Sequence, residues 1–117
     1  NGNFISKIDN FNNTNLNRPS SVHVDDRGYL YISNWGNDTV VIFDDKENFV
    51  NELHGDATLS KRCEEFLDVN PEQSSWRENA GLFEEEKKFW KPTGIDTNKD
   101  LIFISDACRH RVQIYKK

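Results

Sequence analysis

Two stretches of the chain repeat one another, and this internal repeat constrains the fold more than any other feature. The first runs from Arg18 to Asp45 and the second from Lys91 to Lys117. With a one-residue gap at Gly28, the two copies align along their length. Repeats of this kind each form one supersecondary unit, and they bury their apolar faces by stacking on their neighbours.

The aligned positions of the two copies share their chemical character. The matching pairs are Pro19 with Pro92, Val22 with Ile95, Asn34 with Asp106, Val40 with Val112, Ile42 with Ile114, and Phe43 with Tyr115. Apolar positions therefore recur in the same order, which indicates that both copies adopt the same structure.

Each copy contains short runs with the composition of β-strands, separated by turn-forming Asp, Asn and Gly residues. In the first copy we expect strands at Ser21 to Val24, Tyr29 to Ser33 and Thr39 to Phe43, and a fourth strand follows the copy at Asn48 to Leu53. Val40 to Phe43 in the third of these runs is apolar on both faces, and so is Leu101 to Ile104 in the second copy. A strand that is apolar on both faces has to be covered on both faces.

Antiparallel sheets that stack face to face around an axis meet this requirement, so the sequence predicts an all-β fold of propeller blades. We expect two four-stranded antiparallel blades, over residues 19–53 and 91–117, with a small helical insertion over residues 54–90. The whole chain is then a single two-blade propeller unit or a fragment of a larger propeller.

The N-terminal residues extend this pattern. The run from Asn3 to Ile8 resembles the predicted outer strand from Asn48 to Leu53. We therefore expect residues 1–8 to form an outer strand that closes a blade.

The most characteristic part of the repeat is Asp106 to Tyr115, DACRHRVQIY, which resembles the NHL repeat of six-bladed β-propellers. Gly36 and Asn37 fit that family's pattern, whereas Cys108 and Arg109 depart from it. The resemblance implies propeller blades, but propellers host many activities, so it does not imply one particular activity.

The composition of the chain argues against some classes of binding partner. The chain of 117 residues carries a formal net charge of −5, which argues against the phosphate attraction on which nucleic-acid binding depends. No apolar run is long enough to span a membrane and no signal peptide is visible, so we expect no membrane association, and the compartment is left open. The sequence has no methionine, which favours a processed product or a piece of a longer polypeptide.

Four residues are candidates for binding a ligand. His23 and Asp96 align with one another on strands that would line the central channel, where they could hold a metal or a polar ligand, or form ordinary hydrogen bonds. Trp35 could stack on a ligand or pack, and Arg109 lies in the corresponding loop of the second repeat. Asp106 and Arg111 frame that loop, and we expect a structural ion pair between them.

The sequence contains no motif that is typical of a metal site or of a catalytic nucleophile. The two cysteines, Cys63 and Cys108, are far apart in sequence, and we expect a small buried thiol at each place rather than a disulfide. We predict no catalytic residues, no metal and no cofactor.

The leading hypothesis is therefore a non-enzymatic binding module or scaffold for a protein or a small ligand. The alternative is a metal-dependent, lactonase-like hydrolase, because six-bladed relatives hold a metal with a Glu, two Asn and an Asp in the channel. Glu is absent from the predicted inner strands of both repeats. For assembly we expect self-association into a closed ring, in which a trimer gives six blades, or completion of the propeller by the rest of a longer chain.

Overall fold

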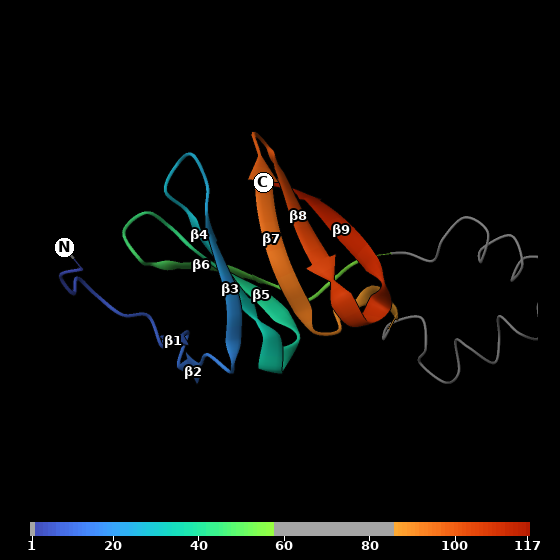
Figure 1. The fold of residues 1–117 in the computed structure, drawn as a ribbon, viewed down its shortest axis with the longest axis horizontal. Coiled ribbons are helices and arrows are strands. Elements are labelled where there is room, and N and C mark those ends of the chain that lie inside the picture. The colour runs from blue at the N-terminus through green and yellow to red at the C-terminus, as the bar shows by residue number, and fades with distance from the viewer. Residues whose placement is uncertain (1, 58–85) are drawn as a thin grey trace, which may run out of the picture.

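The computed structural model describes residues 2–57 and 86–117. Two antiparallel β-sheets stack against each other, and their first strands, β3 and β7, lie side by side (Figure 1). The prediction of an all-β fold made of antiparallel blades is confirmed.

The first sheet contains β3 (Pro19–Val24), β4 (Leu30–Asn34), β5 (Thr39–Phe43) and β6 (Phe49–Leu53), in sequence order. The second contains β7 (Pro92–Asn98), β8 (Leu101–Asp106) and β9 (Arg111–Lys116), also in sequence order. A 3-10 turn joins the second and third strands of each sheet, η1 (Trp35–Asn37) in the first and η2 (Ala107–Arg109) in the second. The strands predicted for the first repeat agree with these bounds except at their end residues.

The repeat in sequence is also a repeat in backbone geometry. Both inner strands have a register shift just after their first proline, Pro19 in β3 and Pro92 in β7. The residue before each proline has a positive φ, 52° at Arg18 and 58° at Lys91. Such angles are uncommon for residues other than glycine, so their recurrence at aligned positions shows that the two copies share one fold in detail.

The main core lies between the two sheets. Tyr31, Val40 and Ile42 of the first sheet pack against Ile102 and Ile104 of the second, and all five are buried. Phe89, from the chain just before β7, inserts between the sheets, and its ring lies 6.0 Å from that of Tyr115. Burial of this apolar surface is the main force that holds one sheet against the other.

The opposite face of the first sheet is covered by a small N-terminal hairpin of β1 (Asn10–Phe11) and β2 (Thr14–Asn15). Phe11 is buried against Ile32, Val41 and Phe43, and its ring stacks on that of Phe49 at 5.6 Å. The buried run of β5 is therefore covered on both faces, as its composition predicts.

Residues 2–8 of the predicted outer strand pair with no described strand of this chain, so closure of a blade by residues 1–8, in a neighbouring copy or in a longer chain, stays a prediction. Residues 2–9 form no strand, and among the described residues the second sheet has three strands and the first has four. The physical reason is distance: the N-terminus lies beyond the first sheet, whereas the unpaired edge of β9 is on the far side of the second (Figure 1). Without an edge to pair with, the segment from Asn3 to Ile8 remains extended and largely exposed.

The predicted helical insertion lies mostly outside the described residues, which stop at residue 57 and resume at 86. The two chain segments that flank it are held together: Phe89 N donates to His54 O at 2.9 Å and Ala57 N to Lys87 O at 3.2 Å. Gly55 permits this approach, because its φ is +102° and a Cβ there would lie 2.4 Å from the backbone N of Phe89. No helix within the described ranges is long and apolar enough to cross a bilayer.

Candidate functional site

The inner strands bring His23 and Asp96 together. The His23 Nε2 atom lies 3.9 Å from Asp96 Oδ1 and forms a 2.7 Å hydrogen bond with Thr97 Oγ1. The Asp96 side chain is 81% exposed, whereas that of His23 is 25% exposed. Sequence reasoning identified the aligned pair but missed Thr97, which comes within reach only because β3 and β7 lie next to each other.

This polar group can hold a small ligand by hydrogen bonds. It presents an imidazole, a hydroxyl and a carboxylate from two blades. Within residues 2–57 and 86–117, no cluster of three His, Cys, Asp or Glu side chains is arranged to hold a metal.

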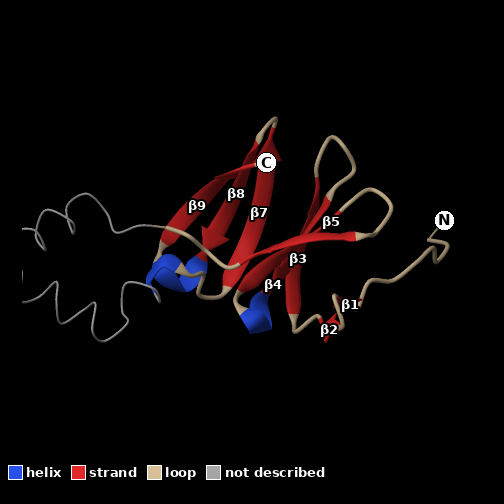
Figure 2. Ribbon diagram, turned by 180° about the vertical axis from the view of Figure 1, so that it is seen from behind, coloured by secondary structure: helices blue, strands red, loops and turns tan. Residues whose placement is uncertain are grey.

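The two 3-10 turns lie at the same end of the sheets, and Figure 2 shows both in blue. At this end Lys91 Nζ lies 4.5 Å from the centre of the Trp35 ring. The same Nζ is 3.3 Å from Asp38 Oδ1, and the backbone N of Lys91 donates to that oxygen at 2.9 Å. The loop of the first blade thus binds the residue that leads into the second.

A second cation and indole pair lies next in the chain. The Arg109 guanidinium carbon lies 5.3 Å from the centre of the Trp90 ring, and Trp90 is 47% exposed. We refer to Trp35, Trp90, Lys91 and Arg109 together as the loop-end surface. Sequence reasoning identified Trp35 and Arg109 but missed the other two, although the alignment of Lys91 with Arg18 was an available signal.

The predicted ion pair between Asp106 and Arg111 is present, with 2.8 Å between Asp106 Oδ2 and Arg111 Nε. Asp106 is fully buried, and its other oxygen accepts a 2.7 Å hydrogen bond from the backbone N of Trp90. Arg111 also donates to the carbonyl oxygens of Glu86 and Lys88. This pair therefore supports the loop-end surface from beneath and does not face a ligand.

Cys108 departs from the sequence prediction of a buried thiol. It is exposed and forms no disulfide within the described part of the chain, because it lies in the turn η2 on the surface. Cys63 lies outside the described residues.

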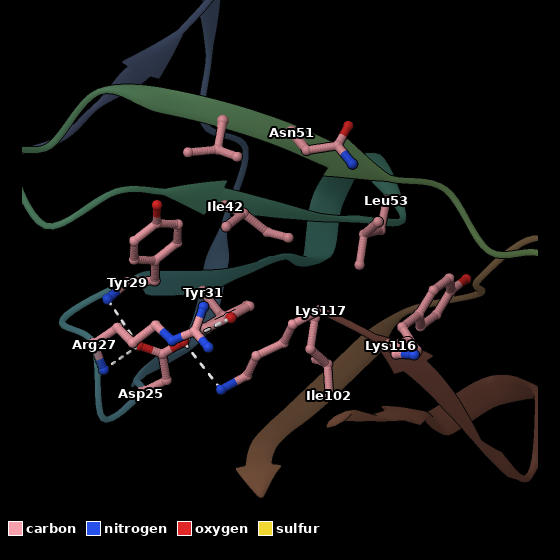
Figure 3. Close-up of a pocket in the computed structure, with 12 residues that line it drawn as sticks. Asp25, Arg27, Tyr29, Tyr31, Ile42, Asn51, Leu53, Ile102, Lys116 and Lys117 are labelled. Carbon is pink, nitrogen blue, oxygen red and sulfur yellow. Dashed lines mark hydrogen bonds and ion pairs between the residues drawn. The ribbon is translucent and has the colours of Figure 1, made fainter. Parts of the chain in front are cut away.

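A cavity of about 240 Å³ lies between the two sheets (Figure 3). It is at the end away from the 3-10 turns, because the turn at Asp25 and the turn η1 lie at opposite ends of β4. Aliphatic and tyrosine side chains from both blades line it, and cationic side chains lie beside them. Sequence reasoning missed this site, because its residues come from separate turns and strands and form no local motif.

Asp25 organises one wall of the cavity. Its carboxylate accepts hydrogen bonds from the backbone N atoms of Arg27 and Tyr29 and from the Tyr31 hydroxyl, each at 2.9 Å. Lys117 Nζ lies 3.1 Å from the same carboxylate. Burial alone would raise the pKa of Asp25, but these donors outweigh it and hold the pKa below its ordinary value.

The stacked antiparallel sheets and their repeated backbone define a pair of β-propeller blades. Within them, residues 89–115 match the family model of the NHL repeat. This match supports the resemblance inferred from the second repeat, and the six-bladed closure remains a prediction. Among curated proteins, none matches the chain.

Proposed function

We propose that this chain is the blade-forming part of a β-propeller of the NHL type, and that it binds a protein partner through the loop-end surface without catalysing a reaction. The observation that carries the proposal is the pairing of two indole rings with two cationic side chains at one end of adjacent blades. The rigid sheets fix the positions of these loops, which is the usual way in which a scaffold presents a binding surface.

The composition of the loop-end surface favours a protein as the partner. Tryptophan and arginine are the residues most often found among those that dominate binding energy in protein interfaces. Trp90 is about half exposed and stacks with Arg109, so it offers a large apolar surface at little cost in side-chain entropy.

Capture from an extract of the source cells, compared between variants, tests this surface. We expect Trp90→Ser to abolish capture of a partner retained by the wild-type chain, and Lys46→Ser, on an exposed turn at the other end, to leave capture unchanged. Equal capture by both variants would rule out the loop-end surface.

Metal analysis separates the binding module from the alternative of a lactonase-like hydrolase. For a binding module we expect no stoichiometric divalent metal in the purified protein and no hydrolysis of lactones. A bound divalent metal together with metal-dependent lactone hydrolysis would replace it with the enzyme.

We further propose that other blades cover the outer face of the second sheet. Val112 and Ile114 are 56% and 59% exposed there, whereas their repeat equivalents Val40 and Ile42 are 0% and 7% exposed beneath the second sheet. The covering blades come from two more copies in a closed ring of six blades, or from the rest of a longer polypeptide.

Light scattering of the 117-residue chain distinguishes these two sources. A trimer mass supports the ring, and an aggregating chain points to a longer polypeptide. A stable, folded monomer would show that the outer face needs no cover.

A further inference from the structure

We infer that the cavity between the two sheets is a binding site for a small aromatic carboxylate. This site lies at the opposite end of the blades from the loop-end surface, because the turn at Asp25 to Gly28 and the turn η1 lie at opposite ends of β4. The inference is thus independent of the proposed function, and either can fail without the other.

The size of the cavity fits one substituted aromatic ring. Its volume is about 240 Å³. A buried apolar cavity of about 150 Å³ is enough to bind benzene in another protein, whereas drug-sized ligands occupy pockets of about 300 Å³ or more. The cavity therefore has room for a ring and a polar substituent, but not for a nucleotide or a large cofactor.

The walls of the cavity favour a flat apolar ligand. Tyr29, Tyr31 and Tyr115 contribute aromatic rings, and Ile42 and Ile102 contribute aliphatic surface. The Tyr31 ring is held in place by the hydrogen bond from its hydroxyl to Asp25. The Tyr115 hydroxyl donates to Gln113 Oε1 at 3.0 Å, so this ring is also fixed before a ligand arrives. Preorganised aromatic walls bind with a low entropic cost.

The charges around the cavity favour an anion. Lys117 Nζ lies 3.1 Å from Asp25 Oδ2 in the wall and 3.8 Å from Asp26 Oδ1, so these carboxylates neutralise its charge. Arg27 and Lys116 also line the cavity, are exposed, and form no ion pair with a described residue. The backbone N of Arg27 is bound to Asp25, which fixes the start of that side chain beside the cavity (Figure 3). The site is thus locally cationic in a chain whose net charge is −5.

Arg27 is the residue that we assign to the carboxylate. A guanidinium group binds a carboxylate through two parallel hydrogen bonds, which an ammonium group cannot reproduce. Lys116 supplies a second, less directional charge. The aromatic ring then lies between the tyrosine rings and the aliphatic side chains of the two blades.

Three small probes test this assignment with the intact chain. Benzoate has both the ring and the carboxylate, benzyl alcohol has the ring without the charge, and acetate has the charge without the ring. We expect benzoate alone to shift the NMR signals of the cavity tyrosine rings with a dissociation constant of about 1 mM or tighter. Absence of benzoate binding, or equal binding of benzyl alcohol or acetate, would overturn the inference.

An arginine variant adds a matched comparison. Arg27→Gln should weaken benzoate binding about tenfold or more, as expected for the loss of a charge-assisted hydrogen bond. Lys46→Gln removes one positive charge from an exposed turn that does not line the cavity, and should leave the affinity unchanged. Because Arg27 is exposed, its substitution is not expected to unfold the chain. Equal affinities in the two variants would overturn the role of Arg27 and the anionic class of ligand.

Discussion

Asn34 and Asp106 make the same hydrogen bond in the two blades. Asn34 Oδ1 accepts from the backbone N of Asn17 at 2.7 Å, and Asp106 Oδ1 accepts from the backbone N of Trp90, also at 2.7 Å. Both acceptors are fully buried, and both donors lie two positions before the first proline of a blade. A buried side-chain oxygen thus fixes the chain as it begins each inner strand.

The two blades differ in how this buried acceptor is supported. Asp106 is paired with Arg111, whereas Thr39 stands at the position equivalent to Arg111 and donates to Glu52 Oε2 at 2.8 Å. The second blade therefore buries a charge that the first one does without. A buried charge is costly once its partner is removed.

We expect Arg111→Thr to destabilise the chain by about 3 kcal/mol, because it leaves the carboxylate of Asp106 buried without its partner. Adding Asp106→Asn gives the second blade an Asn and a Thr at the positions that Asn34 and Thr39 occupy in the first blade. The double variant should therefore recover part of the lost stability. Unfolding in urea gives the free energies for the double-mutant cycle. Strictly additive effects would contradict a coupled pair.

Phe43 is buried on the face of the first sheet that the N-terminal hairpin covers. Phe43→Ala should lower the free energy of unfolding by about 3–5 kcal/mol, the usual range for a buried aromatic residue. Thr14→Ala, at an exposed position of the hairpin, should change it by less than about 0.5 kcal/mol. Similar losses for both variants in a denaturant titration would contradict the burial that distinguishes these positions.

Patterns within the repeat were enough to predict the strands and the all-β fold. The alternation of turn residues with apolar runs determines where β4 and β5 lie, and Val40 to Phe43 indicated a strand covered on both faces. These features depend on local sequence and on the need to bury apolar surface, so a single sequence contains them.

Features that depend on tertiary proximity could not be predicted in this way. The run from Asn3 to Ile8 has the alternation of an outer strand, but no sheet edge formed by residues 2–57 and 86–117 pairs with it. The contact between His23 and Thr97 and the cavity beside Asp25 each require two blades to meet. Sequence alignment placed Asp96 near His23 only because aligned residues on neighbouring inner strands lie next to each other.

Mutations on the outer face of the second sheet should change the association of the chain with other blades. Ile114→Lys should prevent association, because a charge on a contact face has to be desolvated. It should leave the fold of the chain intact, since Ile114 is 59% exposed. Light scattering and circular dichroism together measure both effects. Ile42→Lys, at the buried repeat equivalent, should instead unfold the chain, and unchanged association of the Ile114→Lys variant would contradict a contact through this face.

Two tyrosines make the stability of the chain sensitive to alkaline pH. Burial, together with the negative charge of Asp56, raises the pKa of Tyr115 to about 12. Burial, together with the hydrogen bond to Asp25, also raises the pKa of Tyr31. Both groups therefore favour the neutral phenol in the folded state more strongly than in the unfolded state, where the pKa of tyrosine is about 10.

The sign of the effect follows from proton linkage. Between pH 10 and 12 the unfolded chain loses the Tyr115 proton while the folded chain keeps it, so the free energy of unfolding falls as the pH rises. The stabilisation is complete below about pH 10 and is lost as the pH passes through the folded-state pKa. The useful quantity is the difference in the free energy of unfolding between the wild type and Tyr115→Phe, because effects of other groups cancel in this difference. We expect this difference, measured by urea unfolding at each pH, to be constant below about pH 10 and to shift above it in favour of the variant. A difference that stays constant up to pH 12 would contradict the raised pKa of Tyr115.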